Sequence, residues 1–395
     1  MLKLNHVFMH FKSSLYTSLL LLLTAILPWN RANAQEKYEP AWSNLSGCDY
    51  PQVSSQMNVR VRFHAPNASK VEVAGGDGFT QKPIALAKDK EGYWFGTVPN
   101  VTPGFHYYWF NVDGVQVNDP ASVAYMGYGR PTSGLYAPTP GEEFLECKQV
   151  PHGDVREHTY FSEVTGKWRR AYVYTPAGYD RGTKNRYPIL YLLHGAGEDE
   201  RGWTLQGRMN FILDNLIAEG KAVPMVVVMD NGYATAKGDT ADTSLSRDGM
   251  KKRAEVLMDV YKKDIIPTFE TSYRIKQGRE NRAMAGLSMG GFETLLIGLN
   301  NTDMFAYYGA FSAAIIGGLM DNPKTAFNGV FADAEAFNKN VKLLWFGVGS
   351  NETRFVEMVA DTRDKLNGLG INAQYYQSEN TWSRCLHQFA PLLFK

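Results

Sequence analysis

The chain has 395 residues, of which 44% are hydrophobic, and its formal net charge at pH 7 is +1. This length exceeds that of a typical single domain and suggests two domains, with ample apolar residues for large cores. The near balance of charge provides no basic surface, so we expect no nucleic-acid partner.

Residues 1–34 have the pattern of a secretory signal peptide. Lys3 and Lys12 form a basic leader, residues 19–27 are mostly apolar, and a small-x-small site ends at Ala34. The alternative is a membrane anchor, but the apolar run is too short to span a bilayer comfortably. We therefore expect cleavage after Ala34, a secreted or periplasmic protein, and no membrane association after cleavage.

Three cysteines, Cys48, Cys147 and Cys385, follow this segment. An odd number in an exported protein leaves at least one free thiol or an intermolecular bridge. Cys48 and Cys147 flank the first predicted domain and are candidates for a pair, whereas Cys385 lies in an apolar segment and is expected to be a buried thiol. There is no closely spaced His/Cys cluster, so we expect no metal site, and nothing indicates a cofactor.

Residues 35–121 are predicted to form a small all-β domain. Val59, Val61 and Phe63 alternate with polar residues, and residues 105–110 form an aromatic strand. Several short strands at this spacing are typical of an immunoglobulin-like β-sandwich. The segments that carry a family resemblance are 63–68, 92–94, 103–110 and 112–114.

Those segments resemble the module that precedes glycogen-branching enzymes and are similar to carbohydrate-binding module family 48. The resemblance implies that aromatic side chains of this domain stack on sugar rings. The alternative is that they fill the core of the sandwich, which is the usual place for aromatic residues at alternating strand positions.

Residues 122–149 are rich in glycine and proline, which predicts a linker. From residue 150 to 395, apolar strands such as 188–193, 225–229 and 343–348 alternate with amphipathic helices. This order predicts an α/β-hydrolase domain with a mostly parallel sheet and helices on both faces. Ligands of such sheets bind at the carboxyl ends of the strands.

Ser288 is at the centre of a G-x-S-x-G motif that runs from Gly286 to Gly290. An apolar segment precedes the motif and a helical one follows it, as in the nucleophile elbow of α/β-hydrolases. Small residues are needed on both sides because larger side chains would collide at the sharp turn. We therefore predict that Ser288 is a catalytic nucleophile; the alternative is an ordinary glycine-rich turn.

Two loops at other strand ends complete the predicted pocket. His194-Gly195-Ala196 resembles the oxyanion loop of esterases, so the backbone N–H groups of Ala196 and Met289 are the predicted oxyanion donors. His194 is also a candidate general base, but a histidine in this motif normally braces the loop. The predicted pocket residues are His194, Trp203, Asp230 and Asn231.

Glu352 is the predicted acid of a catalytic triad. It follows the strand 343–349, which comes after the nucleophile, and Glu can replace Asp in this role. The alternative is a solvated loop glutamate.

Several motifs together support a family assignment for residues 150–395. They are Tyr172-Val173-Tyr174-Thr175-Pro176, Leu192-Leu193-His194-Gly195, the segment 214–221, the segment 285–291 and the ending 389–394. These motifs resemble the esterase D group and, more closely, carbohydrate esterase family 1, which contains feruloyl and acetylxylan esterases. The resemblance implies release of ferulate or acetate from plant cell-wall polysaccharide or oligosaccharide esters, through an acyl-enzyme on Ser288.

One departure from the family concerns the catalytic histidine. The family carries it in a glycine-containing loop after the last strand, but here residues 375–380 run almost directly into Thr381 and Trp382. The only downstream histidine, His387, lies on the final helix, more than one turn beyond that loop. His387 is the remaining candidate for the base, and without a base Ser288 is a weak nucleophile.

Three hypotheses remain open at this stage. The first is a secreted carbohydrate esterase, weakened by loss of the histidine loop. The second is a carbohydrate-binding protein that keeps an esterase-like shell without catalysis. The third is a hydrolase of siderophore esters or other small esters, although the predicted export argues against a cytosolic siderophore hydrolase.

Overall fold

The computed structural model describes residues 36–76, 78–137, 141–182, 184–241, 246–313, 322–379 and 382–395. The predicted leader, residues 1–34, lies outside them, as do Asn380 and Thr381. Tyr38–Lys395 forms one compact unit. None of the helices in the described ranges is both long and apolar enough to cross a membrane.

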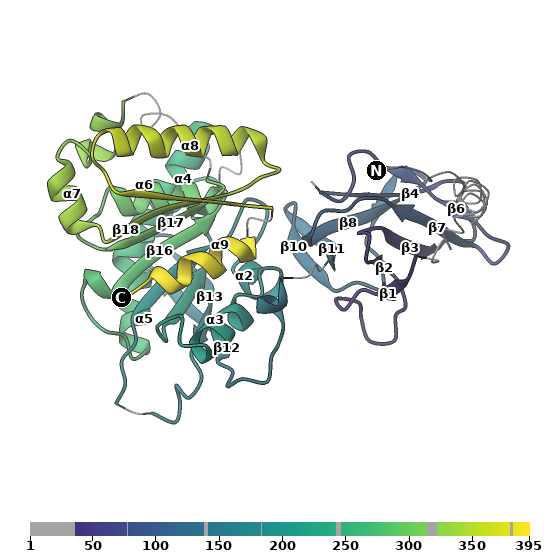
Figure 1. Ribbon diagram of the computed structural model, residues 1–395, viewed down its shortest axis with the longest axis horizontal. Helices are drawn as coiled ribbons and strands as arrows, with labels where there is room; N and C mark the ends of the chain where they lie inside the picture. The colour runs from purple at the N-terminus through teal and green to yellow at the C-terminus, as the bar shows by residue number, and fades with distance from the viewer. Residues whose placement is uncertain are drawn as a thin grey trace, which may run out of the picture. The chain divides into compact units, whose positions relative to one another are not determined.

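The N-terminal part is built from two β-sheets that share one core. The strand order of the first is β1-β2-β3-β7-β6, and that of the second is β10-β11-β8-β4-β5, with β9 on β8 (Figure 1). The strands are β1 (Tyr38–Pro40), β2 (Gln52–Ser54), β3 (Val59–His64), β4 (Val71–Gly75), β5 (Ile84–Ala85), β6 (Ala87–Lys88), β7 (Tyr93–Val98), β8 (Gly104–Val112), β9 (Val115–Val117), β10 (Ala124–Gly127) and β11 (Arg130–Ala137).

The aromatic strand β8 alternates between the two faces of its sheet. Tyr108 and Phe110 are fully buried in the shared core, together with Trp94 from β7. Phe105, Tyr107 and Trp109 point to the other face and are only partly buried. Core filling therefore accounts for two of these five aromatic side chains of β8, while sugar binding by the others stays a prediction.

The predicted linker differs from the structure over its first half. Residues 124–137 form β10 and β11, and β11 pairs with β8 along five residues from Ser133 to Ala137. The glycines counted as linker residues serve this hairpin, where Gly129 adopts a φ of +73° that favours glycine. Composition identified turn residues correctly but did not distinguish a turn between strands from a linker between domains.

The C-terminal part contains an eight-stranded sheet with the order β12-β13-β15-β14-β16-β17-β18-β19. β12 and β13 are antiparallel to their neighbours, and the strands from β15 to β19 in this order are parallel. The strands are β12 (Asp154–Ser162), β13 (Lys167–Thr175), β14 (Ile189–Leu193), β15 (Val226–Asp230), β16 (Arg282–Leu287), β17 (Tyr307–Phe311), β18 (Leu343–Gly349) and β19 (Ala373–Ser378).

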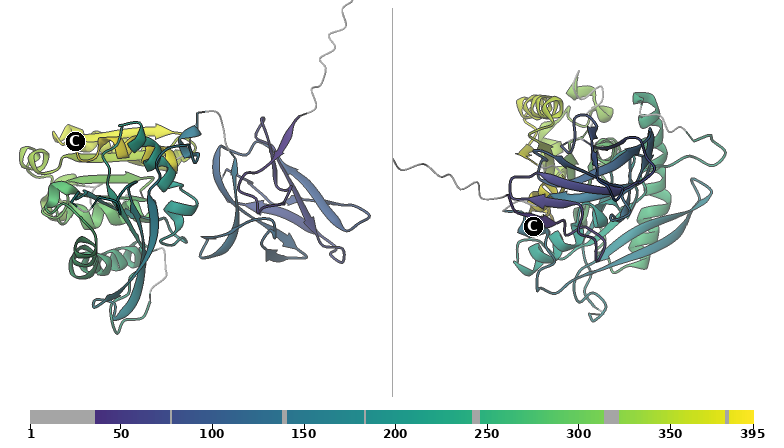
Figure 2. Two further views of the ribbon diagram at one scale, coloured as in Figure 1. Left: turned by 90° about the horizontal axis from the view of Figure 1, so that it is seen from below. Right: turned by 90° about the vertical axis from the view of Figure 1, so that its right-hand side faces the viewer.

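Helices cover both faces of this sheet, as predicted. Side chains of α4–α8 form one core cluster with the sheet, and side chains of α2, α3 and α9 form another (Figures 1 and 2). The helices are α2 (Gly202–Leu205), α3 (Met209–Ala218), α4 (Arg247–Val260), α5 (Ile266–Ser272), α6 (Met289–Leu299), α7 (Ala334–Asn340), α8 (Thr353–Gly368) and α9 (Trp382–Phe389). The short helical turns are η1 (Glu143–Leu145), η2 (Tyr261–Ile265), η3 (Arg279–Asn281), η4 (Pro323–Thr325), η5 (Phe327–Gly329) and η6 (Ala390–Leu392).

The central strands have apolar side chains on both faces because both faces are covered. Every residue of β14, β15, β17 and β18 is buried. Since β14, β15, β16 and β18 run parallel, the loops after Leu193, Asp230, Leu287 and Gly349 emerge at the same edge of the sheet.

Candidate active site

Ser288 lies on the sharp turn between β16 and α6. Its backbone has φ +53° and ψ −107°, a strained conformation for a residue with a side chain. A Cβ on Gly286 would come within 2.4 Å of the Gly290 backbone, and one on Gly290 within 2.6 Å of the His194 carbonyl oxygen. The two glycines are therefore sterically required, and the turn has the geometry of a nucleophile elbow.

The backbone of Ser288 is fixed by hydrogen bonds on both sides of the residue. Its N–H donates to the Phe311 carbonyl oxygen at 2.7 Å, and its carbonyl oxygen accepts from the Phe292 N–H at 3.0 Å. Over the described ranges, the Ser288 hydroxyl makes no hydrogen bond to a side chain. Met289 is the first residue of α6, so its N–H has no partner within the helix and suits the role of an oxyanion donor.

His194 fixes the loop of residues 194–198, called the braced loop below, and is not placed to act as a base. The Gly232 N–H donates to its Nε2 at 3.0 Å, so Nδ1 carries the proton and donates to the Gly195 carbonyl oxygen at 2.8 Å. The side chain is 1% exposed, and burial lowers the pKa of His194, which keeps the ring neutral. Both ring nitrogens are thus engaged in fixing the loop.

Glu198 is a second brace, which sequence reasoning missed. Its Oε2 accepts from the Gly195 N–H at 3.0 Å, and its Oε1 is 3.0 Å from the Tyr107 hydroxyl. Burial raises the pKa of Glu198 to about 8. The Gly197 N–H donates to the Tyr233 hydroxyl at 2.7 Å. The acidic run after His194-Gly195 was the available signal, because a carboxylate three residues from a glycine N–H can close a local turn.

Of the four predicted pocket residues, three are buried and support the sheet edge, and one is half-buried. Trp203 is 1% exposed and its Nε1 donates to the Leu193 carbonyl oxygen at 2.8 Å. Asp230 is equally buried and pairs with Arg169 at 2.5 Å and with the Tyr160 hydroxyl at 2.9 Å. With His194, these side chains support the edge from beneath rather than facing a substrate.

Asn231 is half-buried and lines a cavity of about 610 Å³ beside the braced loop. Its Nδ2 donates to Glu200 Oε2 at 2.9 Å, and Tyr233, which holds Gly197, lines the same cavity. Trp168 also lines it and is 71% exposed. An exposed aromatic ring beside hydrogen-bonding side chains is suited to contact a sugar, although Trp168 is not among the residues predicted from the sequence.

Glu352 lies at the same edge, after β18. Its Oε2 accepts from the Gly349 N–H at 2.9 Å and from the Ser312 hydroxyl. Ser312 follows β17, the strand between β16 and β18, and has a φ of +42°. The structure therefore brings Glu352 to the edge that carries Ser288, where it holds Ser312. Its role as triad acid stays a prediction.

The structure does not bring His387 to Ser288. The His387 ring stacks on Phe144 with 4.3 Å between ring centroids, and burial lowers its pKa. The start of α9 is near the braced loop, where Trp382 contacts Trp203, but His387 is about 7.5 Å further along the axis. In the described ranges, no imidazole is hydrogen-bonded to the Ser288 hydroxyl.

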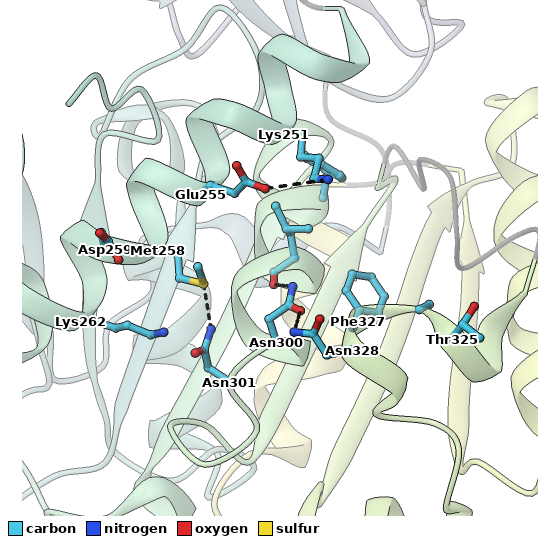
Figure 3. Close-up of a pocket in the computed structure, with 13 residues that line it drawn as sticks. Lys251, Glu255, Met258, Asp259, Lys262, Asn300, Asn301, Thr325, Phe327 and Asn328 are labelled. Carbon is cyan, nitrogen blue, oxygen red and sulfur yellow. Dashed lines mark hydrogen bonds and ion pairs between the residues drawn. The ribbon is translucent and has the colours of Figure 1, made fainter. Parts of the chain in front are cut away.

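A separate cavity of about 780 Å³ lies between α4, α6 and residues 325–328 (Figure 3). Lys251, Glu255, Asp259 and Lys262 place charges of both signs around it, and the Asn328 Nδ2 donates to Asn300 Oδ1 at 2.9 Å. None of the predicted site residues lines this cavity.

Comparison with known proteins defines the class of this molecule. A family model described as "Putative esterase" matches residues 162–389, more than half of the chain. The chain therefore belongs to this esterase family, and the predicted resemblance to carbohydrate esterase family 1 is confirmed. The similarity of the N-terminal part to carbohydrate-binding module family 48 stays a prediction.

Two curated relatives are named as xylanases. The chain is 38% identical over 376 residues to an endo-1,4-beta-xylanase/feruloyl esterase of Xylanibacter ruminicola, covering 91% of this chain and 48% of that protein. It is 28% identical over 219 residues to endo-1,4-beta-xylanase Y of Acetivibrio thermocellus, covering 52% of this chain and 18% of that protein. The chain thus spans about half the length of the first relative and less of the second.

Two solved structures share the fold. A CE1 ferulic acid esterase from Anaeromyces mucronatus has a TM-score of 0.55 at 22% identity and covers 65% of this chain and 96% of its own. The enterobactin esterase from Shigella flexneri has a TM-score of 0.61 at 16% identity and covers 85% of this chain and 92% of its own. These likenesses establish the α/β-hydrolase fold of the C-terminal part.

Proposed function

We propose that this esterase hydrolyses feruloyl or acetyl esters of plant cell-wall xylan through an acyl-enzyme on Ser288. The observation that carries the proposal is the strained turn that presents Ser288 beside a braced glycine loop. The name of the Xylanibacter ruminicola relative, a xylanase/feruloyl esterase, supports the class of substrate.

In the proposed reaction, the Ser288 hydroxyl oxygen attacks the ester carbonyl and its proton leaves to a base. The negative charge that develops on the carbonyl oxygen is stabilised by the N–H groups of Met289 and Ala196. Collapse of this intermediate releases the sugar alcohol and leaves an acyl group on Ser288, which water then removes. Because the expected histidine loop is missing, we propose that both steps are slow in this chain.

We also propose that the mature protein begins at Gln35 and works outside the cytoplasm. The support is the basic leader, the apolar run and the small-x-small site at Ala34. Mass spectrometry of the protein purified from an exporting host tests it, since retention of residues 1–34 would contradict cleavage.

Turnover of methyl ferulate and of acetylated xylan, compared between the wild type and Ser288→Ala, tests the proposed reaction. We expect slow release of ferulate or acetate that Ser288→Ala abolishes, and labelling of Ser288 by a fluorophosphonate probe. Labelling that persists in Ser288→Ala would contradict the nucleophile. Polysaccharide binding without any turnover would favour a carbohydrate-binding protein with an esterase-like shell.

Hydrolysis of a siderophore ester is a second candidate function. It is favoured by the larger share of this chain, 85%, that the enterobactin esterase covers, compared with 65% for the ferulic acid esterase. Parallel assays with methyl ferulate and a cyclic catecholate trilactone distinguish the two. Faster turnover of the trilactone would favour the second candidate.

A further inference from the structure

A thiol, an imidazole and a carboxylate lie in a row away from the predicted active site. Cys147 is exposed on the segment before β12, and its Sγ is 3.6 Å from His152 Nε2. His152 Nδ1 is 2.8 Å from Oδ2 of Asp214, which lies on α3. All three cysteines are free thiols, so the candidate pair Cys48–Cys147 is not formed.

The carboxylate is held in place by two further donors. The Tyr174 hydroxyl donates to Asp214 Oδ1 at 2.7 Å and the Gly153 N–H donates to it at 2.9 Å, while the Asp214 side chain is 1% exposed. A carboxylate accepts hydrogen bonds, so Nδ1 of His152 carries the proton that it donates to Oδ2. Nε2 faces both the Cys147 thiol and the Lys148 carbonyl oxygen, and because a carbonyl oxygen only accepts, this contact belongs to the protonated ring.

The protonated form of His152 is also stabilised. The Lys148 carbonyl oxygen accepts the hydrogen bond that the Nε2–H of the protonated ring donates at 2.9 Å. The hydrogen bond to Asp214 raises the pKa of His152, which favours the protonated ring. Positive charge beside a thiol favours the thiolate, which is the nucleophilic form of cysteine.

This arrangement is not that of a metal site. Cys147 and Asp214 contact opposite ring nitrogens of His152, so their side chains do not converge on one point. Within the described ranges, no group of three or more His, Cys, Asp or Glu residues is able to hold a metal ion. The order thiol, imidazole, carboxylate is instead that of an activated nucleophile.

We propose that Cys147 is an activated thiol and a site of covalent modification by low-molecular-weight disulfides. The Cys147 thiol releases its proton to water, the His152 imidazolium stabilises the thiolate, and the thiolate sulfur attacks one sulfur of the disulfide. A bond from Sγ to that sulfur forms as the disulfide bond breaks, and the departing thiolate takes up a proton from water. The products are a mixed disulfide on Cys147 and one free thiol, so no other oxidant is required.

The other two cysteines serve as internal references. Cys48 is half-buried, and Cys385 is fully buried with a pKa raised by burial. The full reduced chain is incubated with oxidised glutathione at pH 6.5, and each cysteine peptide is followed by mass spectrometry. We expect Cys147 to exchange at least about tenfold faster than Cys48, while Cys385 stays unmodified. Equal rates at Cys147 and Cys48 would overturn the proposal.

His152→Gln tests the origin of the reactivity. We expect the variant to lower the rate at Cys147 to about that of Cys48, because the positive charge beside the thiolate is lost. His158→Gln is the matched control, since His158 is a partly buried imidazole that faces Tyr273 instead. An unchanged rate at Cys147 in folded His152→Gln would overturn the role of the imidazole.

The pH dependence of the wild type tests the same point without a variant. The charged groups around the thiol are His152, Asp214, Arg208, Lys148 and Glu146. An unassisted thiol loses about tenfold in rate per pH unit below its pKa. We expect the Cys147 rate to fall much less than the Cys48 rate between pH 8 and pH 6. Parallel decline of the two rates would contradict activation.

Discussion

Ser288 at the sheet edge and Cys147 on the segment before β12 are both candidate nucleophiles, but their surroundings differ. One is presented on a strained turn, and the other contacts an imidazole. Ser288 is presented on a strained turn beside a loop that His194 and Glu198 brace, but no imidazole in the described ranges contacts its hydroxyl. Cys147 contacts an imidazole that a buried carboxylate orients, yet it lies on an exposed segment. The backbone geometry that presents a nucleophile and the imidazole that activates one are therefore found in different regions of this chain.

The largest expected effect comes from giving Ser288 the base that we propose it lacks. A Gly-Thr-Ala-His-Glu-Trp loop grafted between Ser378 and Thr381 should bring an imidazole to the sheet edge. Loss of a triad member typically costs about four to six orders of magnitude, so we expect the graft to raise kcat for methyl ferulate by about 10⁴-fold or more.

The control for this graft carries alanine in place of its histidine and should stay slow. The prediction also requires a slow wild type. If the wild type already turns over at ordinary esterase rates and His387→Ala abolishes that activity, then His387 is the base and a rearrangement of α9 must bring it to Ser288.

The sequence predicted the parts of the site that are local in the chain. The elbow depends on Gly286, Ser288 and Gly290, whose steric needs can be read from their spacing. The sequence could not place Asp214 beside His152, because 62 residues separate them and only the packing of α3 brings them together. For the same reason, the sequence could not show that His387 stacks on Phe144.

The second prediction concerns Glu198, the buried carboxyl that helps to fix the loop beside Ser288. Burial raises the pKa of Glu198 from 4.5 to about 8 in the folded chain. Between these values the folded chain keeps a proton that the unfolded chain has released, so the free energy of unfolding falls as pH rises from about 4.5 to about 8. The slope is at most about 1.4 kcal/mol per pH unit.

Urea unfolding at several pH values, in the wild type and in Glu198→Gln, measures this slope. We expect Glu198→Gln to flatten the dependence over this pH range. Glu200→Gln is the matched control, because Glu200 is in the same loop but pairs with Arg170. Equal slopes in the wild type and Glu198→Gln would show that Glu198 does not hold a proton in the folded chain.

The third prediction supplies a base from solution. If Ser288 lacks only an imidazole, free imidazole at tens of millimolar should accelerate hydrolysis of an activated aryl ester by about tenfold, a small part of the gain from a positioned general base. Imidazole also attacks such esters directly, so the rate with Ser288→Ala is subtracted. An acceleration equal in the wild type and Ser288→Ala would mean that Ser288 gains nothing from the base.

The smallest expected effect concerns recognition of the sugar rather than activation of the serine. Trp168 is 71% exposed and lines the cavity beside Asn231 and Tyr233, next to the braced loop. A stacked pair of aromatic rings contributes about 0.5–1.5 kcal/mol, and with a similar contribution from a sugar ring on the indole, Trp168→Ala should raise KM for feruloylated oligosaccharides by roughly two- to tenfold. KM for methyl ferulate should not change, because that ester has no sugar to stack.

Trp42→Ala is the matched control, since Trp42 is 50% exposed and does not line this cavity. A parallel rise in KM for both esters would instead indicate a general disturbance of the edge, and no change for either would place the sugar elsewhere.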